Sequence, residues 1–228
     1  MINNSVESGK SERNILPLSL SITSASGLAE HIIERNSEIP VRRELEFSVS
    51  PSDMPSVEVE LTVGECVFAK DNRRLALLRI PGVKNTVGKA PRITVSVELW
   101  KDGSIGFTAF DHGSRKEAKV VIEPEEWLPT DAEITESVTK AKEKEDADAL
   151  TRSNILLIEK AVNTADRAKK TACALRSPLP FGDRFGVLKS SIVLKRKARK
   201  SRPEKMTDSD VINLREGSTR LEVLLSRF

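Results

Sequence analysis

The sequence predicts an antiparallel β-sandwich of about eight short strands followed by a helical segment, with the β part first and the α part second. Between residues 16 and 122, apolar and polar side chains alternate with period two, which is typical of strands that bury one face. After Pro129 the apolar period becomes helical, and neither Gly nor Pro occurs from residue 130 to residue 177. Together these observations indicate two kinds of structure in succession.

The clearest strands show alternation without interruption, and turn residues separate them. Five are predicted at 18–22, 45–49, 57–63, 93–99 and 105–109, and three shorter ones near 30–34, 75–80 and 118–122. The stretch Lys101-Asp102-Gly103-Ser104 favours a tight hairpin, because Gly tolerates positive φ. One-sided alternation with tight turns favours an antiparallel sandwich over a parallel sheet with helices between its strands.

The helical segment has a recognisable start. Thr130 is the predicted N-cap, and Glu133 is its capping-box partner. One or two long helices are expected to follow, but past Ala174 the pattern degrades at the breaker 177–182. The predicted organisation is therefore a disordered segment at 1–13, a sandwich at 14–123, a helical part at 124–176, and at 177–228 a basic, partly disordered tail that could end in a short helix.

The charge is distributed unevenly along the chain. Residues 1–128 carry 16 basic and 19 acidic side chains, net −3, whereas residues 167–228 carry 16 basic and 6 acidic ones, net +10. Six of the eight residues at 195–202 are basic: Lys195, Arg196, Lys197, Arg199, Lys200 and Arg202. A solvated tail is the commoner interpretation of such a run. The alternative is salt-dependent binding to the phosphates of nucleic acid, although no aromatic residue is interleaved to stack on bases.

Several classes of protein receive no support from the sequence. No apolar run approaches the ~20 residues that a membrane span needs, so no membrane partner is expected. The N-terminus lacks the apolar centre of a signal peptide, which makes the cytoplasm the expected location. His31 and His112 have no ligand-spaced neighbours, and Cys66 has no evident catalytic partner. We therefore expect no metal site, no cofactor and no enzymatic activity.

Short motifs in the sandwich region resemble the substrate-binding domain of the DnaK-type, seventy-kilodalton heat-shock chaperones. Residues 16–22 (LPLSLSI) resemble the family's opening strand, T-P-L-S-L-G-I-E, and residues 33–40 (IERNSEIP) resemble its I-x-[KR]-N-x-x-I-P segment. Residues 63–65, 71–75 and 90–95 are similar to its Q-G-E, D-N-x-x-L and P-x-I-x-V segments. The order and spacing match without a gap from about residue 14 to residue 166.

The resemblance implies a peptide-binding mechanism. An extended client peptide would lie in a channel between two loops of the sandwich, held through its backbone and one central apolar pocket. Transferred by position, the pocket would comprise Ile22, Phe47, Val57 and Val59, with Ile93 beneath. Ala25 and Ser50 would arch over the peptide, Ser24 and Ser48 would bond its backbone, and the helices from Pro129 onward would form a lid.

Three departures from the family pattern change what is expected. The stretch at 10–14 is polar where the family has an apolar linker ending in Asp, and thirteen residues precede the match, so we expect no ATP-driven cycle within this chain. The arch residues Ala25 and Ser50 are both small, which would enclose a peptide poorly. The Arg–Asp pair that latches the lid in bacterial members maps to Gly88 and Ala161, so the latch is missing.

Three interpretations of the chain follow from these observations, and two of them assign it a function. In the first, the chain is an ATP-independent module that binds unfolded or extended peptide segments, as a holdase or as a regulator of a complete chaperone or co-chaperone. In the second, it is an interaction or nucleic-acid-binding protein that keeps an inherited sandwich and acts through its basic tail. The third is a degenerate chaperone fragment.

Overall fold

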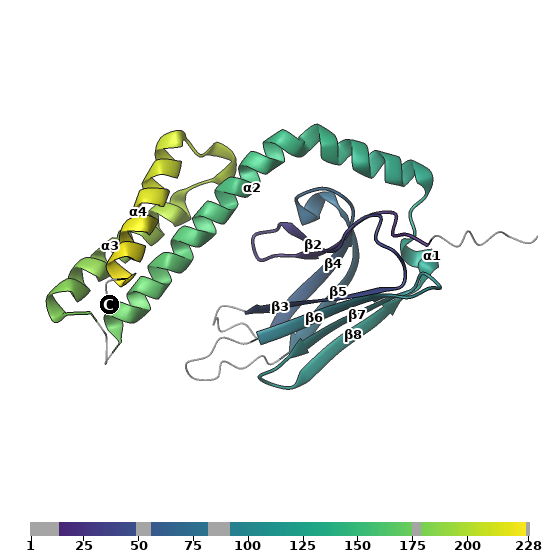
Figure 1. Ribbon diagram of the computed structural model, residues 1–228, viewed down its shortest axis with the longest axis horizontal. Coiled ribbons are helices and arrows are strands. Elements are labelled where there is room, and N and C mark those ends of the chain that lie inside the picture. Colours follow the sequence, from purple (N-terminus) through teal and green to yellow (C-terminus); the bar gives the residue numbers. More distant parts are fainter. Residues whose placement is uncertain (1–13, 49–55, 82–91, 175–178, 227–228) are drawn as a thin grey trace, which may run out of the picture. The chain divides into compact units, whose positions relative to one another are not determined.

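The computed structural model describes residues 14–48, 56–81, 92–174 and 179–226 (Figure 1). Among these residues the chain divides between Lys144 and Glu145 into two compact units. The first unit contains two β-sheets and the start of a long helix, and the second is helical. The predicted disordered segment 1–13 lies outside the described residues.

The first unit is built from two four-stranded antiparallel sheets, as the period-two pattern predicted. One sheet has the order β2-β1-β4-β5, from Ala29–Ile33, Leu20–Thr23, Ser56–Val63 and Arg73–Pro81. The other has the order β3-β6-β7-β8, from Val41–Ser48, Arg92–Leu99, Ile105–Asp111 and Lys116–Ile122. The predicted fold class, eight antiparallel strands followed by helices, is confirmed.

A single hydrophobic cluster occupies the inner faces of both sheets. On β6 every second side chain from Ile93 to Leu99 is fully buried, and Phe107 of β7 is buried with them. Because successive strand residues point to opposite faces, this alternation follows directly from the sequence. Each fully buried aliphatic side chain contributes about 1.5–3 kcal/mol through loss of apolar contact with water.

The largest buried side chain of the cluster comes from outside the sheets. Trp127 lies in the short helix α1 (Pro124–Trp127), and its indole N–H donates to the carbonyl oxygen of Gly103 over 2.9 Å. Gly103 occupies the predicted hairpin turn with φ +88°, and Asp102 Oδ1 accepts the backbone N–H of Ser104 there at 3.0 Å. The turn therefore shapes a hairpin and also anchors the start of the helical segment.

The turn after β7 is organised by a buried carboxylate. Asp111 accepts the backbone N–H groups of Gly113 and Ser114 at 3.0 and 3.1 Å, and the Ser114 hydroxyl at 2.6 Å. Burial alone raises the pKa of Asp111, but the hydrogen bonds from Ser114 and Gly113 outweigh it and hold that pKa below its ordinary value. Asp111 is thus a buried part of the turn, whereas the neighbouring His112 is exposed.

One helix, α2 (Asp131–Cys173), follows the sandwich and continues into the second unit. Its predicted capping box is confirmed. Glu133 Oε2 accepts the backbone N–H of Thr130 at 2.7 Å, and Thr130 Oγ1 accepts the N–H of Glu133 at 3.3 Å. The bonds from the Thr130 backbone and hydroxyl also lower the pKa of Glu133. In the first turns, Ile134 and Val138 pack against the sandwich core.

The second unit packs the later part of α2 against α3 (Phe181–Lys200) and α4 (Asp208–Ser226), with the short η2 (Pro203–Lys205) between them (Figure 1). The sequence predicted a partly disordered tail with at most a short final helix; the structure has two helices of 20 and 19 residues instead. Their buried residues recur at helical spacing, as in Val187, Leu194 and Ala198. The dense cationic residues between these positions obscure the apolar period in the sequence.

We predict that Asp111→Ala lowers the free energy of unfolding of the sandwich by about 2 kcal/mol, because three hydrogen bonds from Gly113 and Ser114 to a charged acceptor are lost. Urea unfolding followed by tryptophan fluorescence measures this, since both tryptophans, Trp100 and Trp127, belong to the first unit. The difference in unfolding free energy between wild type and variant should reach its full size at pH values above the ordinary Asp pKa of 3.8. It should disappear as the pH falls through the lowered pKa that Asp111 has in the folded state. Equal stabilities at neutral pH would contradict this account of the turn.

Candidate functional site

Three of the predicted pocket residues lie on the inner face of the first sheet. Ile22 of β1 is paired in register with Leu61 of β4, and Val59 and Val57 follow at alternate positions on β4. Residues two apart share a face, so all three point into the same core. Val57 retains 8% exposure and is the least buried of the three.

The other two predicted pocket residues lie on the second sheet and face that same core. Phe47 near the end of β3 is the register partner of Ile93 near the start of β6. Ile93 is fully buried, whereas Phe47 is half-buried and packs against the cluster from its edge. The structure thus brings all five pocket residues into or against one hydrophobic cluster, with Phe47 and Val57 keeping the most exposed surface.

The loop after β1 carries two more of the predicted residues and is closed by its own hydrogen bonds. The backbone N–H of Ser24 donates to Leu28 O at 2.9 Å, and the N–H of Gly27 donates to Ser24 O at 2.9 Å. The Ser24 hydroxyl accepts the Leu28 N–H at 3.1 Å. Both backbone groups of Ser24 are therefore engaged within the loop, and a peptide would have to exchange with Leu28 or use the second lone pair of the Ser24 carbonyl. Ala25 is exposed.

The remaining predicted residues are only partly covered by the structure. Ser48 is the last residue of β3, in register with Arg92. Ser50, the second arch residue, lies outside the described residues, as does Gly88 of the missing latch. Ala161, the other latch position, is fully buried in the hydrophobic cluster of the helical unit. Its small apolar side chain packs within that unit.

A polar network beneath the loop was not anticipated from the pattern. Glu65, just after β4, accepts the backbone N–H of Ser19 at 2.7 Å and its hydroxyl at 3.2 Å. The Ser19 hydroxyl in turn accepts the N–H of Arg35 at 2.9 Å. These bonds join the segments before β1, after β2 and after β4. The acidic residue of the motif Val63-Gly64-Glu65 was the sequence feature that could have indicated this network. Its partners could not be identified from the sequence because they are distant along the chain.

Asp71 connects the first turns of α2 to the sandwich. Its carboxylate accepts Lys144 Nζ at 3.0 Å, and its backbone carbonyl accepts Lys140 Nζ at 3.0 Å. Burial raises the pKa of Asp71, but the hydrogen bond and charge of Lys144, with the charge of Lys140, outweigh it and lower that pKa. Asp71 belongs to the short helix η1 (Ala69–Asp71), so two lysines one turn apart hold α2 to a single loop.

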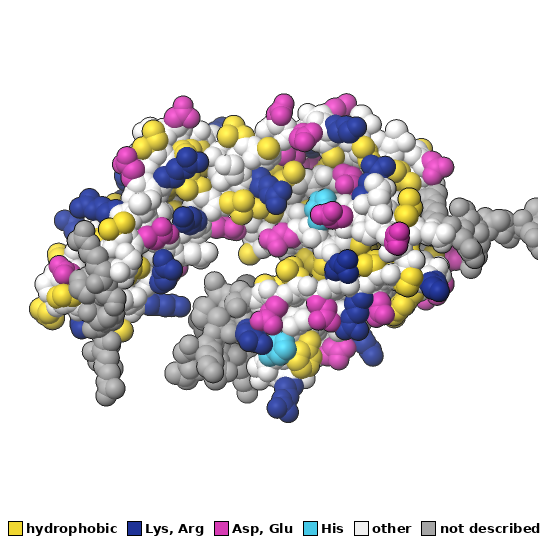
Figure 2. Space-filling view, in the orientation of Figure 1, with side chains coloured by type: hydrophobic (Ala, Val, Ile, Leu, Met, Phe, Trp, Pro, Cys, Tyr) yellow, Lys and Arg dark blue, Asp and Glu magenta, His cyan; other side chains and the backbone are white. Residues whose placement is uncertain are grey.

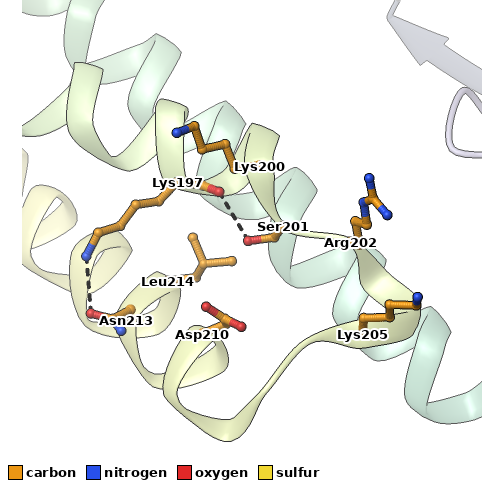
Figure 3. Close-up of a pocket in the computed structure, with 8 residues that line it drawn as sticks. All are labelled: Lys197, Lys200, Ser201, Arg202, Lys205, Asp210, Asn213 and Leu214. Atoms are coloured by element: carbon orange, nitrogen blue, oxygen red, sulfur yellow. Dashed lines mark hydrogen bonds between the residues drawn. The ribbon is translucent and has the colours of Figure 1, made fainter.

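The basic run forms the C-terminal half of α3 and the loop after it. Lys195 is ion-paired with Asp166 of α2, and Lys197 Nζ donates to Asn213 Oδ1 at 3.2 Å. A hollow of about 360 Å³ lies between the end of α3 and the start of α4 (Figure 3). It is lined by Lys197, Lys200, Ser201, Arg202, Lys205, Asp210, Asn213 and Leu214. The structure therefore presents these cations on folded helices and the loop between them, where the sequence indicated a loose tail.

The described residues offer few other functional arrangements. Within them, no cluster of three or more His, Cys, Asp or Glu side chains could hold a metal ion. None of the helices in the described ranges is both long enough and apolar enough to cross a membrane.

Comparison with known proteins assigns the chain to a family. The family model described as "Hsp70 protein" matches residues 11–216. The chain is 32% identical over 142 residues to a chaperone protein dnaK of Guillardia theta, covering 62% of this chain and 22% of that protein. It is 29% identical over 161 residues to a DnaK of Ureaplasma parvum (69% and 26%), and 27% identical over 195 residues to a dnaK of Gracilaria tenuistipitata (86% and 31%). The chain thus spans less than a third of these relatives.

We predict that Asp71→Asn weakens the attachment of the first turns of α2 by about 0.5–1 kcal/mol, the range for a partly exposed ion pair. Hydrogen exchange of backbone amides 134–144 should become faster, with little change in the sheets. The effect should shrink at high salt, and also as the pH falls through the lowered pKa of Asp71, where the wild-type carboxyl is itself neutral. Glu143→Gln, on the exposed face of the same helix, is the matched control. Equal exchange in the two variants would contradict the role given to Asp71.

Proposed function

The chain belongs to the Hsp70 protein family, and from this premise we propose that its sandwich binds short, extended, apolar segments of unfolded polypeptides. The family relationship supports a chaperone-type function. The observation that favours peptide binding is the convergence of Ile22, Phe47, Val57, Val59 and Ile93 on one hydrophobic cluster. A bound segment would place one apolar side chain against this cluster and bond through its backbone to the neighbouring loops.

The proposed pocket residues that remain exposed indicate where a peptide would first contact the sandwich. Phe47 and Val57 keep accessible surface, and they lie on consecutive strands at the ends joined by residues 49–55. Ala25 on the loop after β1 is exposed and small, so it encloses a ligand less than a larger side chain would. Because residues 1–128 carry a net charge of −3, a client with an apolar centre and basic flanks is the best match.

We propose that this contact does not require ATP, since every residue assigned to it lies on β1, β3, β4, β6 or the adjoining loops. The affinity for peptide would then be constant, because no nucleotide cycle would change it, with a Kd on the order of micromolar. In this view the chain is a cytoplasmic binding module and not an enzyme. It would hold clients directly or compete for them with a complete chaperone or a co-chaperone.

One observation favours a second partner class, nucleic acid. Four cations, Lys197, Lys200, Arg202 and Lys205, surround a single hollow in the helical unit. A folded cationic site attracts phosphate more specifically than a solvated tail does. This interaction would be independent of the sandwich, and it would be the main activity if the peptide pocket were an inherited scaffold.

We predict that Val57→Phe lowers affinity for a labelled peptide with a central Leu and basic flanks by at least about tenfold, because the larger ring fills the space of the incoming side chain. Fluorescence anisotropy on the full chain measures binding, and tryptophan fluorescence reports whether the sandwich remains folded. Phe47→Ala, which removes pocket wall without overpacking, should also weaken binding.

The matched control is Val121→Phe, the same change at a position that is 53% exposed on β8. It should leave the affinity within about twofold of wild type, since an exposed substitution away from the site changes little. Absence of wild-type binding at high micromolar peptide would refute the proposed function. So would binding that survives both pocket variants in folded protein.

A further inference from the structure

The helical unit carries a group of cations without acidic partners. Lys195 is paired with Asp166, and Lys160 with Glu222. Within the described ranges, by contrast, no ion pair involves Lys169, Arg196, Arg199, Lys200, Arg202 or Lys205. Figure 2 shows several Lys and Arg side chains on the visible face of this unit, interspersed with Asp and Glu side chains. Uncompensated like charges on one folded unit leave a strong positive field for an external anion.

These cations border two hollows that share Lys200. The first is the hollow between α3 and α4 described above. The second, of about 330 Å³, lies between α2 and α3 and includes Lys169, Ile192, Arg196, Arg199 and Lys200 in its lining. A single extended ligand could therefore engage both by passing over Lys200.

The middle of the first hollow differs chemically from its rim. In the first, Leu214 and Asp210 lie in the middle, while Lys197, Lys200, Arg202 and Lys205 lie around them (Figure 3). Hydrogen bonds from the backbone and hydroxyl of Thr207 lower the pKa of Asp210, so its carboxylate is charged at neutral pH. A charged carboxylate repels phosphate but accepts an N–H donor, whereas the rim attracts phosphate.

Two exposed apolar side chains lie on one side of α3, with Lys189 between them along the helix. Ile192, in the lining of the second hollow, is 54% exposed, and Phe185 lies two turns earlier on the same side of the helix with 75% exposure. An exposed aromatic ring beside a cationic groove is a platform on which a nucleic-acid base can stack.

We propose that α3 and its two flanking hollows bind single-stranded nucleic acid, with phosphates on the rim cations and unpaired bases against Phe185 and beside Asp210. The inference rests on the second partner class proposed above and specifies its ligand and contacts. A base in the first hollow would donate its exocyclic amino group to Asp210, which favours guanine, cytosine or adenine over thymine. A duplex fits less well because its bases are stacked and paired. Inorganic polyphosphate has no N–H group to donate to the carboxylate of Asp210.

The test is fluorescence anisotropy of the full chain with labelled single-stranded DNA of about 15 nucleotides, within the usual range of site sizes. We expect oligo-dC to bind more tightly than oligo-dT or a duplex of equal length. Arg199→Gln with Lys200→Gln should weaken binding about tenfold and reduce the salt slope by about 0.7 for each cation removed. Phe185→Ala should weaken binding about fivefold.

The matched control is Arg215→Gln with Arg220→Gln, which removes the same charge from exposed positions on α4 outside both hollows. It should retain binding, and circular dichroism should show all variants folded. The proposal is overturned if no salt-dependent binding occurs, if the control loses as much affinity, or if polyphosphate or phosphatidylserine vesicles compete as well as oligo-dC at equal charge. Peptide affinity should be unchanged in these variants, and Val57→Phe should leave oligo-dC binding intact, so failure of one site is distinguishable from failure of the other.

Discussion

The hydrophobic cluster between the two sheets is the constraint on which the rest of the sandwich depends. Both sheets bury one face in it, and Trp127 extends it to the start of the helical segment. The proposed peptide pocket consists of residues from the same cluster, so the contacts that stabilise the fold and those that would bind a client belong to one set of side chains. In the proposed function a client side chain would therefore enter at the edge, where Phe47 and Val57 remain accessible.

The helical part has two attachments of different character. Lys140 and Lys144 hold the first turns of α2 to Asp71 through polar contacts, whereas the later part of α2 packs with α3 and α4 in its own hydrophobic cluster. The second unit thus has its own core and its own charge. This separation would allow one chain to carry both the proposed peptide site in the sandwich and the proposed anion site among the helices.

Sequence reasoning succeeded where the determining interaction is local. Period-two alternation in 57–63 and 93–99, the hairpin at Gly103 and the capping box of Thr130 and Glu133 each involve neighbouring residues, and the structure has all of them. It failed where partners are distant in sequence or where charge masks a period. The Glu65–Ser19 network joins residues 46 positions apart, and α3 alternates buried apolar residues with cations. The pocket residues came from family resemblance, because alternation alone cannot distinguish a binding pocket from ordinary core.

Methyl NMR of the full chain with labelled Ile, Leu and Val side chains tests the central claim most directly. On addition of a Leu-centred peptide, the account predicts shifts at Ile22, Val57, Val59 and Ile93 that saturate together, with Val121 and Val223 unchanged. Saturation at a single Kd would identify the cluster edge as the binding site. Shifts confined to methyl groups of α3 and α4, or none at peptide concentrations well above micromolar, would contradict it.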